Sequence, residues 1–231
     1  HSAEHRHAGH SGHRLAESRS RGASLMTSPA QPAARSMIDI SDLTVTKGGQ
    51  TICHVANAIV THGSTVGVTG ANGSGKSTLL RVLADIETGY DGKCIVDASL
   101  KDRVFVHQSP YLFNGTVLSN VEYGLKARSA SRSIRHEKAA LWLERFGIAH
   151  LALRSVESLS GGEKRRTALA RACVLEPKLL LLDEPLADLD PEGIDCVVRS
   201  LSKLDASTIL ITSPSPLPVD LTQATITLKQ E

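Results

Sequence analysis

The sequence predicts an α/β domain in which a mostly parallel sheet carries helices on both faces, with an added antiparallel β element and an inserted helical subdomain. Two observations predict this class. Short aliphatic or β-branched runs alternate with helical segments from Ser64 onward, and two longer alternating segments precede them. The chain has 231 residues, of which 41% are hydrophobic and 22% charged, as expected for a globular domain with one sizeable core.

The elements follow from local patterns. Period-two alternation predicts antiparallel strands, short apolar runs that end in glycine or acidic residues predict buried parallel strands, and 3.6-residue periodicity predicts helices. One helix is expected to stop at Gly147, and another before Pro177. The predicted elements are strands 38–46, 55–60 and 64–70, helix 76–86, strand 104–106, a mainly helical region 116–156 containing helix 134–146, helix 163–175, strand 178–182, helix 191–204, and strands 208–212 and 224–228.

The first 36 residues differ in composition from the remainder. They are rich in His, Arg, Ser, Ala and Pro and show neither helical nor strand periodicity. Such a segment buries too little apolar surface to offset the entropy lost on ordering. We therefore predict a disordered tail over 1–36 and a folded domain over 37–231, with the helical subdomain at about 109–156.

Charge and hydropathy exclude several classes of partner. Five arginines and two glutamates lie in the first 36 residues, which leaves 21 basic and 22 acidic residues elsewhere. Such a balance gives no excess of positive charge to attract a polyanion, so no nucleic acid is expected as a partner. No apolar run approaches the roughly 18 residues of a membrane helix, so any membrane role is expected to act through a partner. The four cysteines form no CxxC pair, which fits a reducing cytosol.

The strongest motif is a GxxxxGK[ST] pattern between a predicted strand and a predicted helix, the context that a phosphate-binding loop requires. Its glycines let backbone N–H groups turn toward phosphate oxygens, its lysine adds a point charge, and its serine is a ligand for Mg²⁺. The alternative is a glycine turn that merely caps a helix. The residues expected to contact the phosphates are Gly70, Ala71, Asn72, Gly73, Ser74, Gly75, Lys76, Ser77 and Thr78.

A second motif places two acids directly after an aliphatic strand, where Asp183 and Glu184 follow residues 178–182. The carboxyl ends of parallel strands meet at the edge of the sheet where open α/β folds bind ligands. Asp183 is expected to reach a Mg²⁺ ion, and Glu184 to orient and deprotonate an attacking water. Taken alone, the pattern is also that of a core strand followed by a helix cap.

A third motif, Leu159-Ser-Gly-Gly-Glu163, begins a predicted helix and is followed by a basic run. Together with the two motifs above, it resembles the signature sequence of the ATP-binding cassette (ABC) ATPases. The resemblance implies that ATP and Mg²⁺ bind, and that two subunits pack head to tail. Ser160, Gly161 and Gly162 would then contact the γ-phosphate of ATP bound to the other subunit, and a helix N-terminus with a hydroxyl suits an anion.

The resemblance extends over residues 37–231. Gln108 matches the glutamine that senses Mg²⁺ and water in this family. Asp190 matches the aspartate of the segment that follows the carboxylates, and the resemblance implies that it belongs to the nucleotide-binding residues. The implied roles are catalytic for Glu184, Gln108 and Lys76, and Mg²⁺ binding for Ser77, Gln108 and Asp183. Segments 108–117 and 120–125 are similar to ATPase subunits of bacterial importers for tungstate, molybdate and phosphate.

The resemblance implies an ATPase subunit that acts as a homodimer or heterodimer and drives a membrane permease from the cytoplasmic face of the membrane. Two alternatives stay open: a nucleotide-gated module with little or no hydrolysis, and a soluble ABC ATPase outside transport. Two departures from the family bear on the choice. Lys47 stands where an aromatic residue usually stacks on adenine, and Ser213 stands where a switch histidine usually contacts the γ-phosphate.

Overall fold

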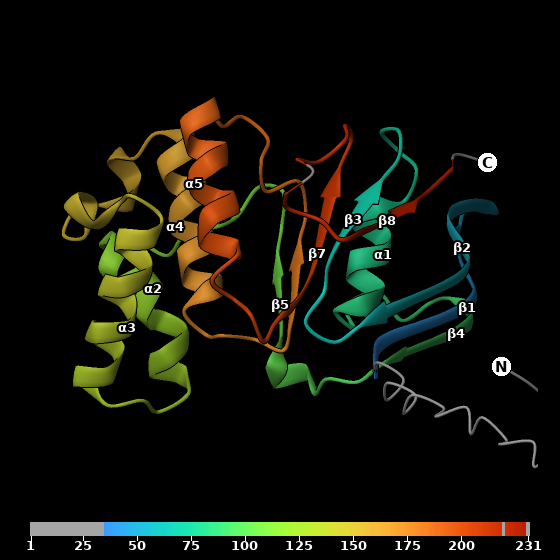
Figure 1. Cartoon of the computed structure of the whole chain (residues 1–231), viewed down its shortest axis with the longest axis horizontal. Helices are drawn as coiled ribbons and strands as arrows, with labels where there is room; N and C mark the ends of the chain where they lie inside the picture. Colours follow the sequence, from blue (N-terminus) through green and yellow to red (C-terminus); the bar gives the residue numbers. More distant parts are fainter. Residues whose placement is uncertain (1–34, 219, 230–231) are drawn as a thin grey trace, which may run out of the picture. The chain divides into compact units, whose positions relative to one another are not determined.

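The computed structural model describes residues 35–218 and 220–229, and Figure 1 traces their path. The predicted tail over 1–36 lies outside the described residues except for Arg35 and Ser36, and the first strand already begins at Ser36. Within the described ranges, no helix combines the length and the apolar composition needed to cross a membrane.

The secondary structure alternates as expected. In chain order the elements are β1 (Ser36–Lys47), β2 (Gln50–Thr61), β3 (Thr65–Thr69), α1 (Lys76–Leu83), β4 (Asp91–Val96), η1 (Leu100–Asp102), β5 (Arg103–Val106), α2 (Val117–Ala127), α3 (Arg132–Arg145), η2 (Ala149–Leu151), η3 (Val156–Ser158), α4 (Gly161–Cys173), β6 (Leu179–Leu182), α5 (Pro191–Leu201), β7 (Thr208–Ser213) and β8 (Ala224–Thr227).

Five strands form a parallel sheet in the order β5-β6-β7-β3-β8. Because all five run in the same direction, the segments that follow β3, β5, β6 and β7 leave the sheet at one edge (Figure 1). The predicted fold class is confirmed, and this edge is where the sequence motifs come together.

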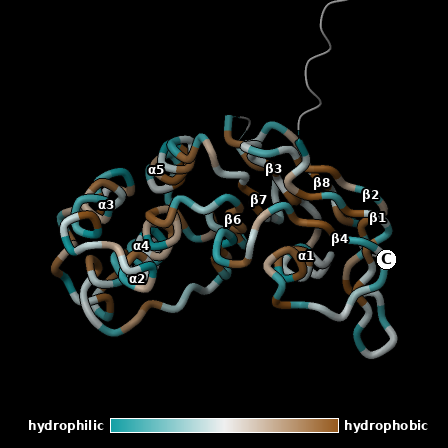
Figure 2. Tube along the Cα trace, turned by 90° about the horizontal axis from the view of Figure 1, so that it is seen from below, coloured by the Kyte–Doolittle hydropathy of each residue, from teal (hydrophilic) through white to brown (hydrophobic). Residues whose placement is uncertain are grey.

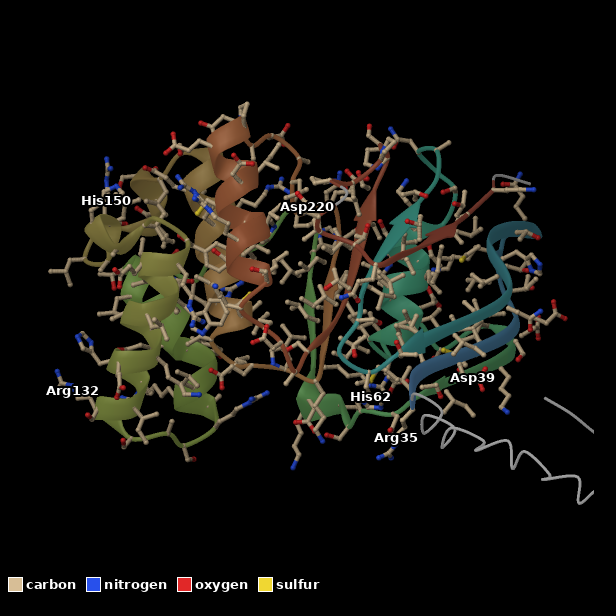
Figure 3. All side chains as sticks on the ribbon, viewed as in Figure 1. Arg35, Asp39, His62, Arg132, His150 and Asp220 are labelled. Carbon is tan, nitrogen blue, oxygen red and sulfur yellow. The ribbon has the colours of Figure 1, made fainter. Side chains whose placement is uncertain are left out.

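The two faces of the parallel sheet pack against different layers. Leu181 and Leu210, which are neighbours in the sheet, face α1 and the antiparallel sheet. Leu180 and Ile209 face the opposite side and join the core with α2, α3, α4 and α5. Figure 2 shows α1 on one side of β6 and β7 with α4 and α5 on the other, and side chains fill both spaces (Figure 3). The helices thus cover both faces, as predicted.

A second, antiparallel sheet has the order β2-β1-β4. The pairing of β1 with β2 agrees with the prediction of an antiparallel element. Strand β4 was not predicted, because its sequence DGKCIV is mostly exposed and shows no apolar alternation. It forms along the free edge of β1, where Ile38 pairs with Val96, so tertiary pairing overrides a weak local pattern.

Helices α2 and α3 belong to an insertion between β5 and β6, within the range predicted for the helical subdomain. An isolated antiparallel bridge joins Thr116, directly before α2, to Ser155, directly before η3. Helix α3 ends as expected, with Gly147 in the left-handed conformation at φ 65°. Helix α1 ends three residues before the predicted Ile86, since Asp85 also adopts a left-handed conformation, at φ 61°.

Candidate functional site

The loop between β3 and α1 has the backbone of an anion-binding turn. Gly73 and Gly75 have φ values of 84° and 88°, in the region where a side chain is strained. A Cβ on Gly75 would also collide with the backbone at Ile52 and Cys53, so only glycine fits between the loop and β2. Helix α1 begins at Lys76 and directs its free N–H groups at this loop.

The polar side chains of the loop are buried. Lys76 is 5% exposed, and its Nζ donates to the carbonyl oxygens of Gly70 at 2.8 Å and Ala71 at 2.9 Å, so the ammonium group lies within the curve of the loop. Ser74 is 3% exposed, and its hydroxyl has no hydrogen-bond partner among the described residues. A buried cation beside a free buried hydroxyl is suited to phosphate oxygens.

The two acids after β6 have different partners: Asp183 contacts the end of the phosphate-loop motif, and Glu184 contacts Gln108. Asp183 is 2% exposed, and its Oδ1 accepts hydrogen bonds from Ser77 Oγ at 2.9 Å and from Thr212 Oγ1 at 2.8 Å. Glu184 Oε2 accepts a hydrogen bond from Gln108 Nε2 at 2.8 Å. Residues far apart in the sequence are therefore joined at the carboxyl edge of the sheet.

A cavity of about 380 Å³ lies over this arrangement. It brings together the phosphate loop, Gln108 from the segment after β5, and Glu184 from the segment after β6. The lining residues are Ile52, Asn72, Gly73, Gly75, Lys76, Ser77, Thr78, Arg81, Gln108, Glu184 and Pro214.

The donor set fits Mg²⁺. Ser77, Asp183 and Gln108 offer a hydroxyl, a carboxylate and an amide oxygen, which are hard oxygen ligands. Within residues 35–218 and 220–229 no three His, Cys, Asp or Glu side chains gather into a metal cage. Mg²⁺ is typically held by one or two protein groups, with phosphate oxygens and water completing the shell, so this sparse set suits a metal that arrives with a nucleotide.

Ser160, Gly161, Gly162 and Asp190 do not line this cavity. Ser160 caps α4 in a capping box with Glu163, whose pKa is lowered because its carboxylate accepts the Ser160 N–H. A Cβ on Gly161 would meet no atom within 4 Å, so the start of α4 is open to solvent. Asp190 caps α5 by accepting the N–H of Gly193 at 2.9 Å.

Comparison with known proteins decides the family. Residues 53–187 match the family model described as ABC transporter. The chain is 33% identical over 184 residues to the tungstate uptake system ATP-binding protein TupC of Peptoclostridium acidaminophilum, with 76% of this chain and 86% of that protein covered. The chain belongs to the ABC transporter family. This ABC chain is an ATP-binding subunit, as the resemblance in its motifs implies.

Other relatives agree with this family assignment. The ABC chain is 38% identical over 177 residues to the Fe(3+) ions import ATP-binding protein FbpC of Streptomyces avermitilis, covering 73% of this chain but only 51% of that protein. Among solved structures it resembles cbiO1 from Clostridium perfringens, part of the ABC transporter complex cbiONQ, at 28% identity and a TM-score of 0.69, with 78% and 79% of the two chains covered. The predicted similarity to importer subunits is confirmed by these relatives.

Two residues at the site were not predicted from sequence. Thr212, fully buried in β7, contacts both Asp183 and the backbone of Glu184. Arg165 of α4 donates to the carbonyl oxygen of Glu184 at 2.7 Å. Thr212 is a β-branched residue in a predicted strand, which is an ordinary place for threonine. Arg165 lies in a run of basic residues, which usually forms a solvated surface. Neither residue therefore had a sequence pattern that predicts a place in the site.

Lys47 lines neither of the two cavities beside the phosphate loop. Its ammonium group pairs with Glu87, and this hydrogen bond lowers the pKa of the Glu87 carboxyl. No Phe, Tyr or Trp side chain lines the cavity over the loop or the neighbouring cavity of about 470 Å³ that shares Ile52 and Gly73 with it; the one aromatic ring in the two linings is the imidazole of His54. The described walls thus offer a nucleotide base no aromatic ring larger than this imidazole, whose Nδ1 is paired with Thr44 Oγ1 at 3.0 Å.

We therefore expect weak discrimination between bases. The parent protein should bind ATP and GTP with affinities that agree within about tenfold, and Lys47→Tyr should strengthen ATP binding by roughly tenfold, because stacking contributes about 1–3 kcal/mol per base. Isothermal titration of both nucleotides measures this, and Lys47→Ala, which breaks the same ion pair without adding a ring, is the control. A strong preference of the parent protein for ATP would contradict the expectation.

Proposed function

We propose that this ABC subunit is a Mg²⁺-dependent ATPase whose turnover drives solute import through a membrane permease. The observation that carries the proposal is the cavity at the sheet edge, where Lys76, Ser77, Gln108 and Glu184 meet beside the buried carboxylate of Asp183. A phosphate loop alone would support nucleotide binding; a carboxylate with a glutamine partner next to it supports hydrolysis.

Each residue has a role in this proposal. The loop N–H groups and Lys76 bind the β- and γ-phosphates, and Ser77, Asp183 and Gln108 hold Mg²⁺, which neutralises charge on the phosphate oxygens. Glu184 accepts the proton of the water that attacks the γ-phosphorus. Gln108, which donates to Glu184 Oε2, orients that carboxylate and the water.

The exposed start of α4 supports a two-subunit arrangement. Ser160 and Gly161 are open to solvent, lie at a helix N-terminus and are absent from the cavity of their own chain. A helix N-terminus attracts anions. In the proposed dimer, homomeric or heteromeric, these residues and Gly162 contact the γ-phosphate of the nucleotide held by the partner's loop, while Asp190 lies near the interface.

An aromatic groove supports the permease as partner. Four of the chain's seven Phe, Tyr and Trp residues line a cavity of about 430 Å³. They are Phe105, which is partly buried, and Tyr111, Phe113 and Tyr123, which are 70%, 38% and 51% exposed. Exposed aromatic clusters mark protein interaction sites. Lining residues lie on both sides of Gln108 in the sequence, at His107 and Pro110, so a permease segment seated in this groove would be linked to the Glu184 carboxylate that Gln108 contacts. The subunit would then lie at the cytoplasmic face of the membrane.

The proposal is tested with the ATPase and a co-purifying permease reconstituted in lipid vesicles. Solute uptake and phosphate release should both require Mg²⁺ and ATP on the side of the vesicle that carries the ATPase. Phosphate release that is the same with and without the permease would leave the ATPase activity standing but contradict the coupling to transport. Absence of any ATP turnover would contradict the enzymatic part of the proposal.

One observation favours a second function, a nucleotide-gated module with slow hydrolysis. Ser213 ends β7 beside Pro214, which lines the cavity, and a serine lacks the imidazole that the family places there. We expect weak parent turnover, because loss of one preorganised contact typically costs on the order of 10² to 10³ in rate. Ser213→His should raise it.

Phosphate release by the parent and Ser213→His proteins measures this effect, with Ser213→Ala as the control that alters the position without adding an imidazole. Parent turnover that is fast, or is unchanged by the histidine, would contradict the role assigned to position 213. No turnover in either protein would favour the nucleotide-gated module.

A further inference from the structure

The backbone of Glu184 has an unusual conformation. Its φ is +47°, in the left-handed region that residues with a Cβ rarely adopt. Non-glycine residues persist there only where the surroundings hold them, and they concentrate at functional sites. The groups that hold this residue therefore decide where its carboxylate points.

Thr212 holds the N–H side of Glu184. The Glu184 N–H donates to Thr212 Oγ1 at 2.8 Å, and the same hydroxyl donates to Asp183 Oδ1, also at 2.8 Å. Thr212 is fully buried in β7, so no water competes for these bonds. One hydroxyl thus joins the backbone of the proposed base to the carboxylate of the proposed metal ligand.

Arg165 holds the carbonyl side of the same residue. Its Nη1 donates to the Glu184 carbonyl oxygen at 2.7 Å, and its Nη2 lies 3.6 Å from Asp188 Oδ2. The Arg165 side chain is 13% exposed, so the bond to the carbonyl is largely shielded from solvent. Asp188 also has a left-handed backbone, at φ 58°, so the arginine spans both strained residues of this turn.

We propose that Thr212 and Arg165 are positioning residues that hold the Glu184 backbone in its left-handed conformation and thereby aim its carboxylate at the attacking water. The inference rests on the proposed ATPase function. It differs from a general role in stability, because two side chains from different elements, β7 and α4, bind the N–H and the C=O of a single residue. Gln108 then needs to restrain only the carboxylate itself.

The first test replaces Thr212 with valine, which keeps the shape and removes the hydroxyl. We expect kcat to fall about 10- to 100-fold with KM for ATP nearly unchanged, because a small misplacement of a catalytic group costs on this order. Thr212→Ser should restore most of the rate. In the nucleotide-free protein, the Glu184 amide proton should exchange with solvent faster in Thr212→Val than in the parent, measured by NMR.

The second test removes the other contact. Arg165→Met should lower kcat in the same way, and Arg165→Lys should restore part of the rate. The matched control is Lys164→Met, which removes the neighbouring charge from an exposed position of the same helix. Arg165 does not contact Asp183, so a loss of kcat in Arg165→Met at an unchanged Mg²⁺ requirement separates aiming of Glu184 from a change at the metal ligand.

The outcomes separate this inference from the function on which it rests. Should the parent protein hydrolyse no ATP, the proposed function fails, and the catalytic role given to these residues fails with it. An active parent whose kcat and Glu184 amide exchange are unaffected by both Thr212→Val and Arg165→Met would overturn the inference alone. If Thr212→Val does not fold, the Arg165 variants decide the question.

Discussion

Glu184→Gln is expected to reduce ATP turnover by on the order of 10² to 10⁴ while ATP binding is retained, because an amide of the same shape cannot accept the proton of the attacking water. Gln108 can still lie beside it, since its Nε2 would donate to the glutamine carbonyl in place of the Glu184 carboxylate. Phosphate release and nucleotide titration measure the two quantities. The control is Glu137→Gln, an exposed position on α3 far from the site in the sequence.

The same variant tests the dimer. With hydrolysis blocked, light scattering should show an Mg-ATP-dependent dimer of Glu184→Gln. Adding Ser160→Arg should abolish this dimer, because the substitution places bulk and charge at the open start of α4. A Glu184→Gln protein that stays monomeric under saturating ATP would argue against the head-to-tail arrangement, and unchanged turnover would argue against Glu184 as the base.

Lys76→Ala should strongly weaken nucleotide binding. It removes the buried ammonium group from the curve of the loop, where it reaches the carbonyls of Gly70 and Ala71. Hydrogen bonds to charged groups contribute about 1.5–3 kcal/mol each, so nucleotide affinity should fall on the order of 10- to 100-fold. Titration with a fluorescent ATP analogue measures the loss.

Circular dichroism should show the fold of Lys76→Ala intact, since the loop lies at the edge of the sheet. Lys203→Ala, at an exposed position after α5, controls for loss of a positive charge. If Lys76→Ala binds nucleotide with the same affinity as the parent, the phosphate loop is not part of the nucleotide site, and the proposed function loses its basis.

Most of the fold and the site's main parts could be predicted from sequence, because glycine, lysine and paired acids occupy sharply constrained places. Gly75 fits where no Cβ does, and Asp183 follows the strand that carries it to the sheet edge. These residues signal their roles locally. Ser160 and Asp190 were found by resemblance, and their contacts with a nucleotide stay a prediction, since they require a second subunit.

What could not be predicted depends on long-range contacts. β4 forms because β1 has an edge that β2 leaves unpaired, and the residues of β4 show no alternating apolar pattern that predicts a strand. Thr212 and Arg165 have residue types that are ordinary in a strand and in a surface helix. The role proposed for them depends on the left-handed backbone of Glu184 and on the packing of β7 and α4 against it, which no local sequence pattern predicts.

The strand order has a consequence for folding. Among the described strands, β3, which precedes the phosphate loop at Gly70, pairs only with β7 and β8, and both of these lie after residue 207. A chain lacking these late strands would contain Lys76, Asp183 and Glu184 without the backbone pairing that supports the loop. Contacts of such high sequence separation form slowly. A ligand stabilises only the state that binds it. Nucleotide should therefore shift the folding equilibrium toward molecules with the complete five-stranded sheet and away from those that lack β7 and β8.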